Sequence, residues 1–165
     1  MKIKYLLLLQ LLTFCICASA APKIDFALSC INPEQQNSNV RPTLVVVYGN
    51  TGLSVEPGME KVYKLKRTTS NANYYFFEAE VPFDYGHDPQ KWDIDRQSLQ
   101  LTMTTPQVKV SGMSLGPYTN KYQCTPIDDS KRSAAYDFVQ DFYKKIVQEH
   151  NNSLQPSRNT KDNKI

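Results

Sequence analysis

The sequence predicts a mainly β (α+β) domain, an antiparallel barrel or sandwich of about seven to eight short strands with one C-terminal amphipathic helix. Three observations predict this class. Short segments in which apolar and polar residues alternate recur along the chain, separated by Gly, Pro, Asn and Asp. One segment near the end of the chain has its apolar residues at helical spacing instead. Cys30 and Cys124 lie in the first and the last of the alternating segments.

Residues 1–20 have the pattern of a secretory signal peptide. Two lysines precede an apolar run, and Ala18-Ser19-Ala20 supplies the small residues that a signal peptidase requires. We therefore expect cleavage after Ala20 and a mature protein that is periplasmic or secreted. A lipoprotein is the alternative, because Cys15 and Cys17 lie near the end of the apolar run. Bulky residues precede both of these cysteines, however, where a lipoprotein needs small ones.

The charge of the mature chain is close to neutral. The whole sequence has 19 Lys and Arg residues against 16 Asp and Glu residues, and two of the lysines belong to the predicted signal peptide. Nucleic-acid-binding proteins usually carry a strongly basic surface, so we expect no nucleic-acid partner. We also expect no membrane span in the mature chain. The sequence predicts one domain at residues 21–150 and a disordered tail at residues 151–165, where apolar residues are scarce.

Cys30 and Cys124 are the cysteines that remain after cleavage. An exported protein folds in an oxidising compartment, where an even pair of cysteines usually forms a disulfide. We therefore predict a Cys30–Cys124 disulfide that joins the first strand to the last, with two free buried thiols as the alternative. The residues indicate no cofactor and no resident metal, so none is expected.

Four segments in the first half of the mature chain have distinct patterns. Residues 23–30 alternate apolar and polar side chains and predict a half-buried strand. Residues 44–48 form a continuous apolar run, typical of a strand covered on both faces. Residues 52–58 begin and end with glycine and contain a proline, which predicts a turn or loop. Residues 60–68 alternate with lysines on one face and predict an edge or outward-facing strand.

Residues 74–83, YYFFEAEVPF, begin with four aromatic side chains and then alternate apolar and acidic residues. The alternation predicts a strand with one apolar face in the core. The residues of that face are Tyr75, Phe77, Ala79, Val81 and Phe83. Tyr74 and Phe76 then point outward, where they either pair with long side chains of a neighbouring strand or form a ligand-facing aromatic patch.

The second half of the chain predicts more strands and the helix. A hairpin covers residues 92–103, a short strand begins at Val108, and a last strand lies within residues 119–127. Residues 130–149 carry apolar side chains three and four positions apart, which predicts an amphipathic helix. Its apolar stripe, which includes Phe138, is expected to cover an open face or end of the sheet.

Aromatic and histidine side chains at outward positions and in loops are the candidate binding residues, because tyrosine offers a rigid contact area with a polar tip. These candidates are Tyr74, Phe76, Tyr85, His87 and Tyr118. No motif of a catalytic nucleophile accompanies them, so we expect no catalytic residue. The prediction is a non-catalytic binding or interaction module whose partner is an unknown protein or small ligand. The competing hypothesis is a metal-dependent hydrolase that uses His87, which lies between two aspartates in its loop.

An enzyme inhibitor is a further alternative. The segment Val110-Ser111-Gly112, together with Tyr118 and Lys121, resembles the serine-glycine and lysine elements of periplasmic lysozyme inhibitors, which are small disulfide-tied barrels. The resemblance covers these few residues, and its spacing departs from that family's motif. The resemblance implies a small barrel fold and an inhibitory activity. Because it is this short, it assigns no binding residues.

Overall fold

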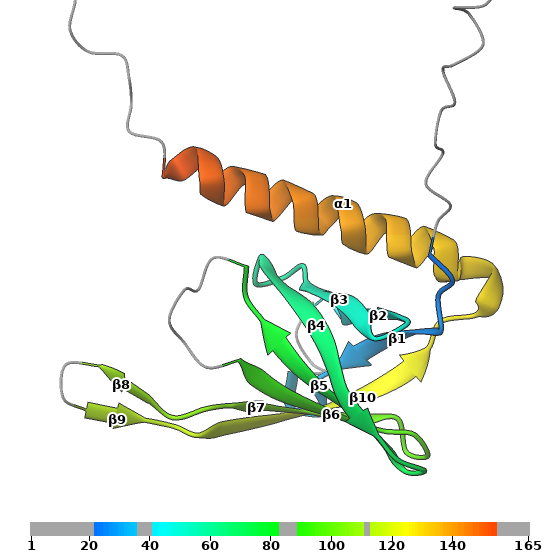
Figure 1. The fold of residues 1–165 in the computed structure, drawn as a ribbon, viewed down its shortest axis with the longest axis horizontal. Helices are drawn as coiled ribbons and strands as arrows, with labels where there is room; N and C mark the ends of the chain where they lie inside the picture. Colours follow the sequence, from blue (N-terminus) through cyan, green and yellow to red (C-terminus); the bar gives the residue numbers. More distant parts are fainter. Residues whose placement is uncertain (1–21, 36–40, 83–88, 111–112, 155–165) are drawn as a thin grey trace, which may run out of the picture.

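The protein is an eight-stranded antiparallel barrel with one long helix packed on its outside (Figure 1). The computed structural model describes residues 22–35, 41–82, 89–110 and 113–154. Around the barrel the strands follow the order β1-β10-β7-β6-β5-β4-β3-β2, and β8 and β9 form a separate two-stranded sheet. The predicted mainly-β class is confirmed, and the alternatives of barrel and sandwich are resolved as a barrel. The elements are β1 (Phe26–Ile31), η1 (Pro33–Gln35, a 3-10 helix), β2 (Thr43–Tyr48), β3 (Thr51–Glu56), β4 (Lys61–Ser70), β5 (Tyr74–Glu80), β6 (Gln90–Asp95), β7 (Gln100–Thr105), β8 (Val108–Val110), β9 (Met113–Leu115), β10 (Tyr118–Pro126) and α1 (Asp129–Ser153).

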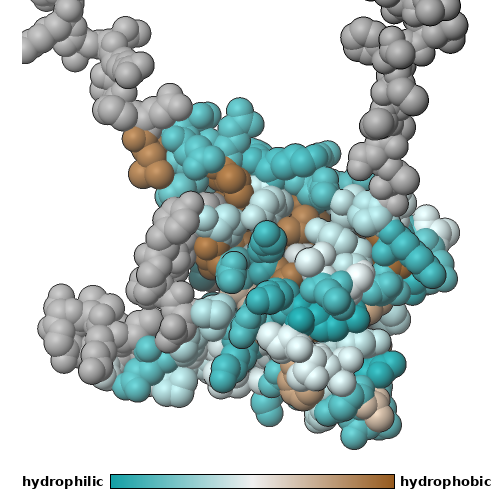
Figure 2. Space-filling view, in the orientation of Figure 1, coloured by the Kyte–Doolittle hydropathy of each residue, from teal (hydrophilic) through white to brown (hydrophobic). Residues whose placement is uncertain are grey.

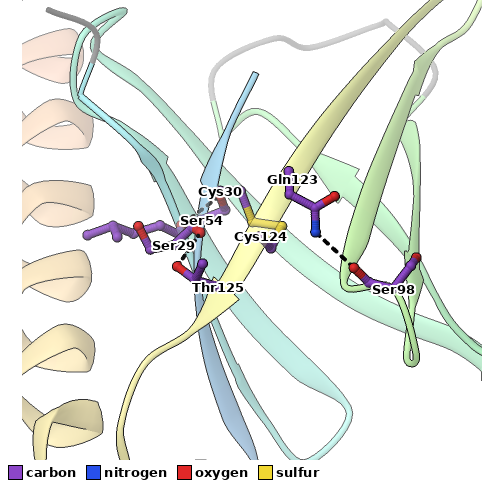
Figure 3. Close-up of a disulfide and its surroundings, with 8 residues drawn as sticks. Ser29, Cys30, Ser54, Ser98, Gln123, Cys124 and Thr125 are labelled. Atoms are coloured by element: carbon purple, nitrogen blue, oxygen red, sulfur yellow. Dashed lines mark hydrogen bonds between the residues drawn. A yellow bond between two sulfur atoms is a disulfide. The ribbon is translucent and has the colours of Figure 1, made fainter. Parts of the chain in front are cut away.

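The pairing of β1 with β10 closes the barrel. β1 pairs antiparallel with β2 on one side and with β10 on the other. Cys30 lies directly opposite Cys124 in this register, and the two form a disulfide (Figure 3). The Thr125 hydroxyl also donates a hydrogen bond of 3.3 Å to the Ser29 carbonyl oxygen across the same strands. The prediction that a disulfide joins the first strand to the last is therefore confirmed.

A packed hydrophobic core fills the barrel interior. Trp92 and Tyr63 are its largest fully buried side chains, with ring centroids 5.0 Å apart. Phe77 lies beside them, as the predicted inward face of β5 requires. The other buried members of this core are Leu28, Cys30, Val45, Val47, Leu65, Ala79, Ile94, Leu101, Met103 and Cys124.

A second hydrophobic core lies between α1 and the outer faces of β1 to β4. The helix contributes Tyr136, Val139 and Ile146, and Val139 is fully buried. Figure 2 shows hydrophobic side chains gathered between the helix and the strands beneath it. The buried residues that the strands contribute are Ala27, Val46, Leu53, Val55 and Val62. Since β2 faces a core on each side, its continuous apolar run is explained.

The helix is longer than the sequence predicts. α1 spans 25 residues and ends at Ser153, so residues 151–153, which the sequence assigns to a disordered tail, are helical. Residues 155–165 lie outside the described part of the chain. Phe138, assigned to the covered stripe, is 47% exposed and stacks on Phe142 instead. Successive helical residues are about 100° apart, so Phe138 lies at the side of the helix when Val139 points toward the barrel.

The prediction of a turn or loop at residues 52–58 is wrong, because most of this segment is β3. Its inward positions, such as Gly52 and Ser54, carry small side chains, whereas its apolar residues face the helix. β2 and β4 pair with it on both sides, and this pairing overrides the local turn signal. Gly52 is required by close packing, since a Cβ there would lie 2.7 Å from the Val46 carbonyl oxygen.

β4 is a strand as predicted, but it is not an edge strand. It pairs with β3 and with β5, because a closed barrel leaves no edge. Lys64 and Lys66 are exposed on its outer face, as the alternation predicts. The register with β5 shifts between Arg67 and Thr69, which marks a β-bulge next to the β4–β5 hairpin.

β8 and β9 form an arm that extends away from the barrel between β7 and β10 (Figure 1). β8 confirms the short strand predicted at Val108. The sequence does not predict β9, because three residues between two glycine-containing segments are too few to show an alternation.

Replacing both cysteines, in the variant Cys30→Ser/Cys124→Ser, is expected to lower the free energy of unfolding by roughly 4 to 5 kcal/mol. The disulfide joins positions 94 residues apart, and without it the unfolded chain regains the entropy of that loop. Urea denaturation followed by the fluorescence of the buried Trp92 measures the change. The wild-type protein in reducing agent is the control and should match the variant. An unchanged urea midpoint would mean that backbone pairing alone holds β1 to β10.

Candidate functional site

Tyr74 and Phe76 lie together on the outer face of β5. Their rings stack with centroids 5.8 Å apart and planes inclined by 30°. Tyr118 is 54% exposed at the start of β10, so that β6 and β7 lie between it and the aromatic pair. Tyr85 and His87 lie outside the described residues. Of the candidate binding residues, the structure thus brings Tyr74 and Phe76 into contact and places Tyr118 elsewhere on the barrel.

The position of Tyr74 is set by its neighbours in the hairpin. The Asn71 side-chain oxygen accepts a hydrogen bond of 2.8 Å from the Tyr74 backbone N–H. The Tyr74 side chain also hydrogen-bonds to the Asp95 carboxylate, which faces it across the β5–β6 pair. The backbone N–H groups of Ser98 and Gln97 donate to the same carboxylate, and together with Tyr74 they lower the pKa of Asp95. The aromatic pair is therefore held in place before any ligand arrives.

A shallow hollow of about 310 Å³ opens beside Phe76, at the bulge of β4. The hydroxyl of Thr68, at the register shift of the bulge, donates a hydrogen bond of 3.3 Å to the Phe76 carbonyl oxygen. This hollow is called the Phe76 pocket below. The residues that line it are Thr68, Thr69, Phe76, Phe77, Glu78, Lys91 and Asp93.

A second hollow of about 440 Å³ adjoins the first and extends toward the base of the β8–β9 arm. The two hollows share Glu78 and Lys91, so they adjoin, and together they are called the outer groove below. Prolines at three points give the second hollow rigid apolar walls. Its lining residues are Glu78, Pro89, Lys91, Thr104, Pro106 and Pro117.

The charged side chains of the outer groove lie near one another without forming close ion pairs. Glu78 and Lys91 face each other across β5 and β6, and Asp93 follows Lys91 on the same face. Among the residues that the structure describes, none of the three forms an ion pair within 4.0 Å. Partial burial raises the pKa of Asp93, and the nearby Lys91 acts in the opposite direction. The groove therefore presents available charges next to an aromatic surface.

Glu56 is a second unusual carboxyl group, and it lies inside the barrel. Only 6% of it is exposed, and the Tyr63 side chain hydrogen-bonds to its carboxyl group. Its Oε1 atom has no hydrogen-bond partner among the described residues. Burial raises the pKa of Glu56, although Lys61 and the Tyr63 hydrogen bond lower it. A buried carboxyl group with an unsatisfied oxygen destabilises the fold most when it is ionised.

The phenols beside Glu56 stay neutral themselves. Burial raises the pKa of the Tyr122 hydroxyl, and the charge of Glu56 raises it further. The pKa of Tyr63 is raised for the same two reasons. Both hydroxyls therefore stay protonated and can act as donors to the carboxyl group.

No metal site is found among the described side chains, where no group of three or more His, Cys, Asp or Glu residues is arranged to hold an ion. The loop of His87, on which the hydrolase hypothesis depends, lies outside the described residues. In the described part of the chain, no helix combines the length and the apolar character that a membrane crossing needs. The chain matches no family model, no curated protein and no solved structure. Function is therefore inferred from the geometry of the groove.

The sequence does not point to Glu78, Lys91 and Asp93 as neighbours. Glu78 and Asp93 lie in different strands, and their proximity depends on the register of the β5–β6 pair. Alternation alone could show that each faces outward, but not which residues of other strands lie beside it. The sequence does not point to Glu56 either, because its segment is predicted to be a loop.

Glu56→Gln is expected to change how stability depends on pH. The pKa of Glu56 in the folded protein lies above its ordinary value of 4.5, so folding is favoured by the protonated form. This contribution is fully present below pH 4.5 and is lost as the pH rises through the higher folded pKa. In acid, the free energy of unfolding of the variant should therefore be equal to or lower than that of the wild type. At neutral pH it should be higher, by an amount on the order of 1 kcal/mol.

The difference between the two urea unfolding free energies, measured at several pH values, isolates the effect of Glu56 from that of the other carboxyl groups. Glu80→Gln is the matched control, since Glu80 is exposed on the outer face of β5. A difference between Glu56→Gln and wild type that stays constant with pH would contradict the raised pKa of Glu56.

Proposed function

We propose that the protein is a non-catalytic binding module that acts in the periplasm or outside the cell and contacts its partner through the outer groove. An extracytoplasmic location is supported by the Cys30–Cys124 disulfide, a bond that persists in oxidising compartments. It is also supported by the signal-peptide pattern of residues 1–20.

The observation that carries this proposal is the character of the outer groove. Two adjoining hollows run across the outer faces of β4 to β7, outside the core that α1 forms with β1 to β4. The lining combines an aromatic ring, rigid prolines and three charged side chains that form no ion pair within 4.0 Å in the described part of the chain. A surface with fixed aromatic groups and available polar groups loses little entropy when it binds, which favours recognition.

Phe76→Ser is expected to weaken binding in the groove by about tenfold, because it removes the aromatic wall of the pocket. The measurement uses peptides selected from a random displayed library for binding to the wild-type protein, with affinities compared by calorimetry. Phe138→Ser is the matched control, since Phe138 is an exposed aromatic residue on α1, away from the groove. Circular dichroism checks that both variants fold. Peptides that bind Phe76→Ser as tightly as wild type, or that lose affinity with Phe138→Ser, would place recognition elsewhere.

Enzyme inhibition is a second candidate function. The supporting observation is the β8–β9 arm, because a two-stranded projection beside a barrel has a shape that can enter an enzyme cleft (Figure 1). The arm carries the Ser111-Gly112 segment of the lysozyme-inhibitor resemblance, although these two residues lie outside the described part of the chain. Lys121 of that resemblance is exposed on β10.

If the protein is an inhibitor, it should slow the hydrolysis of bacterial cell walls by a lysozyme at near-stoichiometric concentration. Lys121→Ala should then reduce this inhibition by about tenfold, because an exposed lysine is placed to pair with the carboxylates of a glycosidase cleft. Lys145→Ala is the control, since Lys145 is an exposed lysine on α1, outside β10 and the β8–β9 arm. Full lysozyme activity in the presence of excess protein would exclude this candidate for the lysozyme tested.

A further inference from the structure

The Phe76 pocket combines an aromatic ring with a carboxylate, Asp93, that forms no hydrogen bond with a residue that the structure describes. Phe76 faces Asp93 directly across the β5–β6 pair, and Tyr74 faces Asp95 one step along the strands. Asp95 is already satisfied by Tyr74 and by the turn that follows β6. The Asp93 carboxylate, in contrast, makes no hydrogen bond, and no ion pair within 4.0 Å, with another residue that the structure describes; the nearby Lys91 acts on it only through its charge. The pocket therefore has one carboxylate available to a ligand.

The surroundings of Asp93 favour a cationic ligand. Two carboxylates, Glu78 and Asp93, line the pocket against one ammonium group, that of Lys91. Asp93 is partly buried, and this burial raises its pKa, so its ionised form lacks full solvation. An incoming positive charge would replace the lost solvation, and the face of Phe76 would add a favourable cation–π contact.

The same chain shows how this combination holds a guanidinium group. Arg67 lies over the rings of Tyr75 and Phe77, with its guanidinium carbon 5.2 and 5.8 Å from the ring centroids. Its terminal nitrogen also contacts the Asp25 carboxylate at 3.4 Å. Arg96 stacks on Tyr75 at 4.7 Å. These two arginines bind ring faces and carbonyl or carboxylate groups elsewhere, so neither serves the Phe76 pocket.

We propose that the Phe76 pocket binds an arginine side chain of a partner protein, with the guanidinium on the ring of Phe76 and paired to the Asp93 carboxylate. Guanidinium suits both neighbours, because it stacks on aromatic faces and donates two parallel hydrogen bonds to a carboxylate. The remainder of the outer groove, toward Pro106 and Pro117, then receives the chain that flanks the arginine. This inference rests on the proposed binding role of the groove and specifies the chemistry of its partner.

Replacing Lys91 tests the arginine assignment, because an arginine partner and an acidic partner predict changes in affinity of opposite direction. Lys91 lines both hollows and opposes the binding of a cation. Lys91→Gln should therefore strengthen the binding of an arginine peptide several-fold, whereas Asp93→Asn should weaken it by about tenfold. A groove that recognises an acidic partner would respond in the opposite direction to both substitutions.

The experiment titrates isotope-labelled full-length protein with a blocked Gly-Arg-Gly tripeptide and with its citrulline counterpart, which has the same shape without the charge. Amide chemical shifts report the site and the affinity. The arginine peptide is expected to shift the amides of Thr69, Phe76 and Asp93 in a saturable way, and the citrulline peptide should bind about tenfold more weakly. Asp137→Asn, an exposed carboxylate of α1, is the matched control and should bind like wild type.

The outcomes separate this inference from the proposed function. Equal binding of the arginine and citrulline peptides, or stronger binding by Asp93→Asn, overturns the arginine assignment. If selected library peptides still depend on Phe76 in that case, the groove remains a binding site for another chemistry. If neither the tripeptides nor the library peptides bind the groove, the proposed function fails together with the inference.

Discussion

Antiparallel pairing of β1 with β10 is the interaction on which the rest of the structure depends. It joins the two ends of the sheet, so eight short strands enclose one core and none keeps an open edge. The Cys30–Cys124 disulfide fixes the same pair covalently and restricts the unfolded chain. Because β1 is held in this way, β2, β3 and β4 follow in register and present one continuous outer face to α1.

The outer surface of the barrel has two parts that differ in residue composition. The outer faces of β1 to β4 carry an apolar region that is buried beneath α1, where it stabilises the fold, whereas Lys64 and Lys66 of β4 lie outside it and are exposed. The outer faces of β5 to β7 carry the aromatic pair, the threonines and the available charges of the outer groove. The bulge in β4 lies at the boundary, and the Phe76 pocket opens beside it. The outer groove thus lies on the part of the sheet that α1 leaves uncovered.

Two carboxyl groups whose pKa values are raised by burial have different consequences. Glu56 is buried inside the barrel beside phenol groups, so its effect falls on stability and on the dependence of stability on pH. Asp93 lies in an open hollow beside an aromatic ring, so a partner can supply the missing charge. Burial therefore favours the neutral state of Glu56 in the core, whereas a cationic ligand at Asp93 would favour its ionised state. This difference in access is the reason why we propose a recognition role for Asp93 and a structural role for Glu56.

The sequence by itself determined the alternation of most strands, the amphipathic helix and the disulfide, because these depend on local spacing and on a single pair of cysteines. It could not identify β3, since the strand places small and polar residues inward and its stability comes from pairing with β2 and β4. It could name Tyr74 and Phe76 as outward aromatic residues, but Asp93 and Glu78 join them only through the β5–β6 register. Tertiary structure decided the groove, because contacts between strands depend on register and closure, which local alternation does not encode.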